Sequence, residues 1–370
     1  MSRAAPRRRA EPRAGRRAAR PPARRAPRAA EPTERTSPPL RRRAAHGLGF
    51  LGWLLVVLVA AAALVAALLG TVDPWVGDAG SVALTAAYTW GLAARTGGRP
   101  VVFTLLALVL GGAVIGLDDD SLRSGAAVGT AVVTAVFAVM VTVPAVHVLG
   151  AVRENVVALL VASAGALATV GWSPVVDLDR FHYTVLALSL VASFLTVFRL
   201  GAGWHGLGTR GVLTVVAGSV MLALTLGYAE LLQRYGTPGL VETLDDAVRW
   251  SHHHLGAFPR PIVALLGVPA LTWGTHMRAR RRQGWWVCAF GVALTGPVAY
   301  ALVDPHRSVR EVALSVGYGA LIGLVIGYLL IRIDLRLTGP RLTGPRGRRL
   351  AEREEATAVR PEPGRTHALW

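Results

Sequence analysis

Ten long runs of apolar residues constrain this chain more than any other feature. A membrane-spanning helix needs about 20 mainly apolar residues, and runs of roughly this length recur through the middle of the sequence with almost no charge inside them. They lie at about 47–70, 79–94, 101–117, 124–149, 155–172, 182–200, 211–232, 261–277, 284–303 and 312–333. The pattern predicts an all-α integral membrane protein with a bundle of about ten transmembrane helices, and it excludes an ordinary soluble enzyme.

The run at 79–94 is the weakest of the ten, because it is short and contains several hydroxyl side chains. Loop charges support it, since cytoplasmic loops accumulate Lys and Arg. With ten spans and a cytoplasmic N-terminus, the inner loops carry nine Arg against one acid, whereas the outer segments carry 7 Arg against 13 acids. The inner residues are Arg95, Arg99, Arg153, Arg199, Arg210, Arg278, Arg280, Arg281, Arg282 and Glu154. We therefore expect an even number of helices and two cytoplasmic termini in a plasma membrane.

Most of the positive charge lies in two tails. The whole chain has a net charge of +18, of which residues 1–46 contribute 15 Arg and 3 Glu and residues 332–370 contribute 9 Arg and 5 acids. The first tail is rich in Arg and Pro and has almost no large apolar side chain, so it cannot offset the entropy lost on ordering. We expect residues 1–46 to be a disordered basic tail, 47–333 the transmembrane domain, and 334–370 a basic, mostly disordered tail.

The tails also indicate the partners. Arginines beside a transmembrane helix attract anionic lipids, so the lipid bilayer and its anionic headgroups are the expected partners. An Arg-rich arm can also bind phosphates of nucleic acid, but aromatic residues that would stack on bases are absent from the N-terminal tail. This composition argues against nucleic acid as a partner.

Signals for catalysis are absent from the sequence. There is no HExxH helix, no Gly-x-Ser-x-Gly elbow, and no pair of acidic residues inside an apolar run. The charged or ionisable residues nearest to the membrane interior are predicted to be His147, Arg199, Glu230 and Arg332, each close to a helix end. We therefore expect no catalytic residues and no cofactor.

The longest outer loop contains a segment, about 238–255, with apolar residues at helical spacing. This spacing predicts an amphipathic helix that lies in the membrane interface. Acidic and histidine side chains four to seven residues apart on such a helix are weak candidates for a metal site. The candidates are Glu242, Asp245, Asp246 and His253. The alternative interpretation is a neutral, interface-seeking histidine cluster, and the spacing favours it.

The last apolar run carries small residues at four-residue steps: Ser315, Gly319, Gly323 and Gly327. This spacing places all four on one helix face and allows another helix to approach closely. An internal contact is the favoured interpretation, and a homo-oligomer seam is the alternative.

Two prolines lie at equivalent positions of a weak internal repeat. A shift of 153 residues places Pro144 on Pro297 and Thr142 on Thr295. If the core is two five-helix halves, an odd number of helices requires the second half to be inverted, and inverted repeats place a substrate path between the halves. The expected path residues are therefore Thr142, Pro144, Thr295 and Pro297.

These patterns favour a multi-pass bacterial plasma-membrane protein that works as a permease-like carrier of a small, weakly charged solute. The alternative is a non-catalytic membrane scaffold or envelope-assembly component that binds partners through its tails and outer loop. A carrier predicts a water-accessible cavity near the four path residues, whereas a scaffold predicts a solid core.

Overall fold

The computed structural model describes residues 40–202, 204–338, 360 and 362–369, and the description below concerns the unit formed by residues 48–370. In these residues the regular elements are all helical. They are α1 (Leu40–Leu68), α2 (Pro74–Arg95), α3 (Pro100–Leu117), α4 (Asp120–Met140), α5 (Val148–Gly171), α6 (Leu178–Val197), η1 (Phe198–Ala202), α7 (Trp204–Tyr235), α8 (Pro238–Leu255), η2 (Val263–Gly267), α9 (Val268–Arg278), α10 (Gly284–Ala289), α11 (Val292–Val303) and α12 (Val309–Thr338).

Eight of the helical segments are long and apolar enough to cross a membrane. They correspond to α1, α3, α4, α5, α6, α7, the α10–α11 pair and α12. The two remaining expected spans, 79–94 and 261–277, coincide with α2 and with η2 and α9. These results confirm an α-helical, multi-pass membrane protein.

The exterior of the bundle is apolar. On α3 the side chains of Val102, Leu105, Leu106 and Val109 are all more than half exposed. A soluble protein rarely exposes a continuous apolar surface of this kind, and lipid is the solvent that such a surface requires. By contrast, α9 and the α10–α11 pair are almost entirely buried, so the core of the bundle lies around them.

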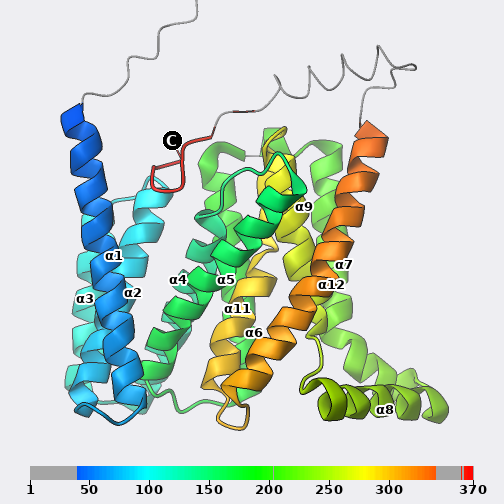
Figure 1. The fold of residues 1–370 in the computed structure, drawn as a ribbon, viewed down its shortest axis with the longest axis horizontal. Coiled ribbons are helices and arrows are strands. Elements are labelled where there is room, and N and C mark those ends of the chain that lie inside the picture. Colours follow the sequence, from blue (N-terminus) through cyan, green and yellow to red (C-terminus); the bar gives the residue numbers. More distant parts are fainter. Residues whose placement is uncertain (1–39, 203, 339–359, 361, 370) are drawn as a thin grey trace, which may run out of the picture. The chain divides into compact units, whose positions relative to one another are not determined.

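The two ends of the bundle differ (Figure 1). At one end α2, α9 and α12 finish and α5 begins, and the C-terminal segment 362–369 lies there too. At the other end lie the α1–α2 connection and α8, which runs across the direction of the other helices. We call the first end the arginine end, because Arg95, Arg153, Arg278 and Arg280–Arg282 all belong to it.

α8 covers the range that the spacing of apolar residues predicts. Its first turn contains Pro238, which is favoured there because its missing N–H has no helical partner, and it ends at Gly256, a glycine with φ +78°. Leu240, Leu244 and Trp250 on α8 are exposed. An exposed apolar face on a helix that lies crosswise suits the surface of a bilayer.

The small residues of α12 pack inside the chain. An added Cβ would lie 3.1 Å from Val263 at Gly319, 2.6 Å from Val268 at Gly323 and 2.7 Å from Thr272 at Gly327. The Ser315 hydroxyl donates to the carbonyl of Phe258 at 2.7 Å. This face of α12 is therefore occupied by η2, α9 and the residues before them, and a homo-oligomer through the same face would have to displace them.

The connection between the fourth and fifth predicted helices lies earlier in the chain than expected. The run at 124–149 is not one helix, because α4 ends at Met140 and α5 begins at Val148, so residues 141–147 form a break. Pro144 lies in this break and not inside a helix. Proline lacks an N–H and disfavours helical conformation in the residue before it, here Val143. As a consequence Arg153 and Glu154 belong to α5 and not to a loop.

Candidate functional site

In the α4–α5 break, at the arginine end, backbone N–H and C=O groups lack the hydrogen-bond partners that a continuous helix would provide. Residues that leave a helix inside a membrane protein need other partners for their N–H and C=O groups. Here Ala145 N–H donates to the carbonyl of Thr275 at 3.1 Å, and the Thr142 hydroxyl donates to the carbonyl of Val139 at 2.7 Å. Three charged side chains that the fold buries bind Thr142, the Met140 carbonyl and the Val143 N–H.

Arg95, the last residue of α2, is the first of these side chains and is only 3% exposed. Its Nε donates to the carbonyl of Met140 at 3.0 Å, and its Nη2 donates to the carbonyl of Thr142 at 3.4 Å. Its Nη1 donates to the carbonyls of Gly364 and His367 in the C-terminal segment. Arg95 thus joins the break to the end of the chain.

Arg278, the last residue of α9, is fully buried. Its Nη1 donates to the Thr142 hydroxyl at 2.8 Å and its Nη2 to the Thr142 carbonyl at 3.1 Å. The same Nη2 forms an ion pair with Glu362 Oε2 at 2.8 Å. The guanidinium carbon lies 3.5 Å from the centre of the Trp285 ring, a cation–π contact that helps to offset the loss of water.

Glu154 lies in the second turn of α5 and is also fully buried. Its Oε2 accepts from Val143 N–H at 2.9 Å. Its carboxylate pairs with Arg153 at 3.0 Å and with Arg365 at 2.8 Å. The carboxylate therefore binds the N–H of the Thr142–Val143 peptide bond, whereas Arg278 binds its carbonyl.

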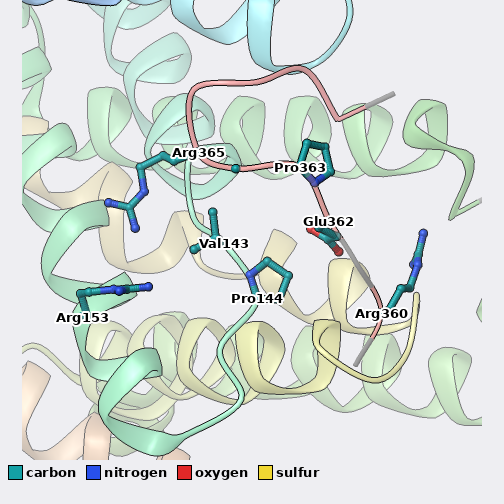
Figure 2. Close-up of a pocket in the computed structure, with 8 residues that line it drawn as sticks. Val143, Pro144, Arg153, Arg360, Glu362, Pro363 and Arg365 are labelled. Atoms are coloured by element: carbon teal, nitrogen blue, oxygen red, sulfur yellow. The ribbon is translucent and has the colours of Figure 1, made fainter. Parts of the chain in front are cut away.

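The C-terminal segment fills part of this site. Arg360 N–H donates to the carbonyl of Ala279, and Leu369 N–H donates to the carbonyl of Arg95. Beside the segment a pocket of about 530 Å³ remains, open on one side and lined by Val143, Pro144, Arg153, Arg360, Glu362, Pro363, Gly364 and Arg365. Figure 2 shows Val143 and Pro144 between Arg153 on one side and Glu362 on the other. These contacts lie within the range 334–370 that we expected to be a mostly disordered tail.

Positive charge predominates around the pocket. Burial and, next, the nearby charge of Arg282 lower the pKa of Arg360, and Glu362 is the acidic residue that partly offsets this. Among the most buried groups, Arg95 and Arg278 are balanced by Glu154 and Glu362. Because Glu362 comes from the C-terminal segment, the other three of these buried groups, Arg95, Arg278 and Glu154, carry an excess of one positive charge by themselves.

The structure separates the four expected path residues. Pro144 lines the pocket, and Thr142 lies directly behind it as the partner of Arg278. Thr295 is buried elsewhere, where its hydroxyl donates to the carbonyl of Ala135 at 3.0 Å. Pro297 is buried inside α11, and its carbonyl accepts from Arg260 at 3.1 Å. Pro144 and Pro297 thus have different structural roles, one in a break and the other in a helix.

The candidate metal ligands on α8 are not gathered into a site. Glu242, Asp245, Asp246 and His253 are all exposed, Asp246 pairs with Arg249, and His253 lies against His254 with 4.9 Å between ring centres. Across the residues that the structure describes, no three His, Cys, Asp or Glu side chains lie close enough together to hold a metal ion.

None of the ionisable residues predicted to lie nearest to the membrane interior is buried within the bundle, as far as their side chains are described. His147, Arg199 and Arg332 are exposed, and the side chain of Glu230 lies outside the described residues. Among the described residues, the buried charged or histidine side chains include Arg95, Glu154, His276, Arg278 and Asp304. Pro144 was the available signal: a proline that ends α4 early makes 148–154 the start of the next helix and draws Glu154 into the bundle.

Comparisons with known protein families, with curated proteins and with solved structures found no match for this chain.

Proposed function

We propose that this protein is a permease-like carrier of a small, weakly charged solute in a bacterial plasma membrane, with ten transmembrane helices and both termini in the cytoplasm. One observation carries the proposal: buried Arg95, Glu154 and Arg278 converge on the irregular connection between two membrane helices, α4 and α5. Charged side chains inside membrane proteins are costly and mark ion or substrate sites. Irregular backbone at such a site leaves polar groups that can contribute to binding.

The structure shifts the proposed path. Thr295 and Pro297 are packed against neighbouring helices, whereas the pocket lies at Pro144. The proposed entry is therefore the arginine end, and the route beyond it passes along α4, α5 and α9, whose contacts must rearrange during transport. The π-helical turn η2 leads directly into α9, and turns of this kind are frequent at functional sites.

The scaffold alternative is supported by a different observation. Thr295 and Pro297 are buried, and α8 presents exposed apolar and charged residues on the other end of the bundle. A scaffold needs an exposed binding surface, and α8 is the proposed one.

Solute flux decides between the two. Purified protein is reconstituted into liposomes and tested with a panel of labelled sugars, organic acids, amines and amino acids. A carrier gives saturable uptake of at least one solute, and Arg278→Gln lowers that uptake by at least about tenfold, because the buried partner of the break is lost. Arg310→Gln, an exposed change at the other end, leaves uptake unchanged. Absence of flux for every solute, together with capture of partners through α8 or the tails, would establish the scaffold instead.

A further inference from the structure

Two opposite buried charges bind the two sides of one peptide bond. Arg278 Nη2 donates to the Thr142 carbonyl at 3.1 Å, and Glu154 Oε2 accepts from the next N–H, that of Val143, at 2.9 Å. The oxygen and nitrogen of one peptide unit are about 2 Å apart. The cationic and anionic groups therefore lie at most about 8 Å apart, given these contacts and the peptide dimensions.

Each of the two charges is paired with a residue of opposite charge from the C-terminal segment. Glu362 pairs with Arg278 at 2.8 Å, and Arg365 donates to both oxygens of Glu154, at 2.9 and 2.8 Å. The segment thus presents an anion and a cation together. A ligand with a single charge replaces only one of these two contacts. A ligand without a cation leaves Glu154 with Arg153 as its remaining charged partner, and the side chain of Arg153 is 64% exposed.

The segment fits the site incompletely. Arginine and carboxylate form their strongest contact through two parallel hydrogen bonds, but Arg278 and Glu362 share one. Among the described residues, Arg278 Nε and Glu362 Oε1 are buried atoms without a hydrogen-bond partner. Arg365 is 32% exposed, and the pocket of about 530 Å³ next to it is open on one side. The C-terminal segment therefore has incomplete contacts with the site, and the pocket beside it is large enough for a small molecule.

We propose that Arg278 and Glu154 form a binding site for a small zwitterion of the α-amino-acid type, and that the C-terminal segment occupies this site through Glu362 and Arg365 until such a ligand displaces it. The ligand carboxylate pairs with Arg278 and its ammonium group with Glu154. In an α-amino acid these groups are about 3 Å apart, and two hydrogen bonds of about 2.8 Å to the protein complete the span. The statement that this ligand is the transported solute rests on the proposed function. Binding of the ligand does not require transport.

Ligand-dependent thermal stability of the full chain tests the proposal, because a ligand that binds the folded state raises Tm. Glu362→Gln and Arg365→Gln together weaken the C-terminal occupant and leave Arg278 and Glu154 intact. The probes are each of the twenty L-amino acids and glycylglycine, added to detergent-solubilised protein. We expect at least one probe to raise the Tm of the double variant saturably, with an apparent affinity at least about tenfold higher than for the unmodified chain, because the competitor is weakened.

Derivatives that carry one charge are the specificity control. For each active amino acid, the N-acetyl form retains only the carboxylate and the amide form retains only the ammonium group. Each is expected to bind at least about tenfold more weakly, since one buried group loses its partner. The matched variant Asp246→Asn with Arg249→Gln removes an exposed ion pair on α8 and is expected to respond like the unmodified chain.

If the double variant fails to fold, a second measurement tests the same proposal on the otherwise unmodified chain. An environment-sensitive fluorophore is attached at Thr366→Cys in the otherwise unmodified chain, whose single cysteine, Cys288, is buried. An active amino acid changes the fluorescence saturably as the segment leaves. If no probe changes Tm or fluorescence, or if the one-charge derivatives act as well as the amino acids, the zwitterion site is wrong. Flux of an uncharged solute that is lost in Arg278→Gln would leave the carrier standing and overturn this site alone.

Discussion

Arg278 illustrates how a residue with a full charge is stabilised inside this protein. Its side chain has no exposed surface, yet it contacts two oxygens of Thr142, the carboxylate of Glu362 and the face of Trp285. Replacing one partner of a buried ion pair typically costs about 3–5 kcal/mol, because the other charge stays buried without compensation. The stability of the site therefore depends on pairs and not on single residues.

A double-mutant cycle on Arg278 and Glu362 measures this dependence. Arg278→Gln and Glu362→Gln are each expected to lower the free energy of unfolding, and the double variant is expected to lose about 1–3 kcal/mol less than the sum, as for coupled neighbours. Denaturant unfolding in detergent provides the values. The exposed pair Asp246–Arg249 serves as the reference, with a coupling below about 1 kcal/mol because water screens it. Strict additivity at Arg278 and Glu362 would contradict the contact.

At the scale of elements, the close approach of α12 to η2 and α9 depends on the absence of side chains. An added Cβ at Gly323 would lie 2.6 Å from a Val268 carbon and 3.1 Å from the Ala264 carbonyl oxygen. Gly317, on the same helix, has nothing within 4 Å of an added Cβ. α9 carries Arg278 at its end, so this packing also positions the site.

Gly323→Ala and Gly317→Ala form a matched pair that tests the packing. Gly323→Ala is expected to lower the free energy of unfolding by about 1–3 kcal/mol through overpacking. Gly317→Ala is expected to be neutral or to stabilise the helix by up to about 1 kcal/mol, because alanine is the better helix former. Tm values in one detergent give the comparison, and a Tm for Gly323→Ala at or above that of Gly317→Ala would refute the close contact.

At the scale of the whole molecule, charge distinguishes the two ends of the bundle. The arginine end holds the site and the C-terminal segment, and the opposite end holds α8 and acidic residues such as Asp118 and Asp304. Because positively charged loops remain in the cytoplasm, the proposed orientation places the arginine end inside. α8 then lies at the outer surface.

Cysteine labelling in intact cells tests this orientation. Thr366→Cys reports the arginine end and Thr243→Cys reports α8, since both residues are exposed. A membrane-impermeant maleimide is expected to label Thr243→Cys in intact cells and Thr366→Cys only after permeabilisation. The unmodified chain is the blank, because its Cys288 is buried. Labelling of both positions from the same side would exclude the ten-helix topology.

Hydropathy and spacing along the chain were sufficient to predict the class of protein, most helix ranges, the amphipathic helix at 238–255 and the face of small residues on α12. These features depend on residues a few positions apart, since the length of an apolar run and a four-residue step act within one helix. The burial of charge was not predictable in this way. Arginines near helix ends were interpreted as loop charges at a membrane surface, yet Arg95 and Arg278 are buried within the bundle.

The sequence by itself therefore determined that this chain enters a membrane as a set of helices with one strongly basic side. Only the tertiary structure decided where the charges go, because the contacts that bury them join distant residues. Arg278 reaches Thr142 across 136 positions, and Arg95 reaches Gly364 across 269. Local patterns carry no information about such partners, and a buried charge is tolerable only where the fold places a partner beside it.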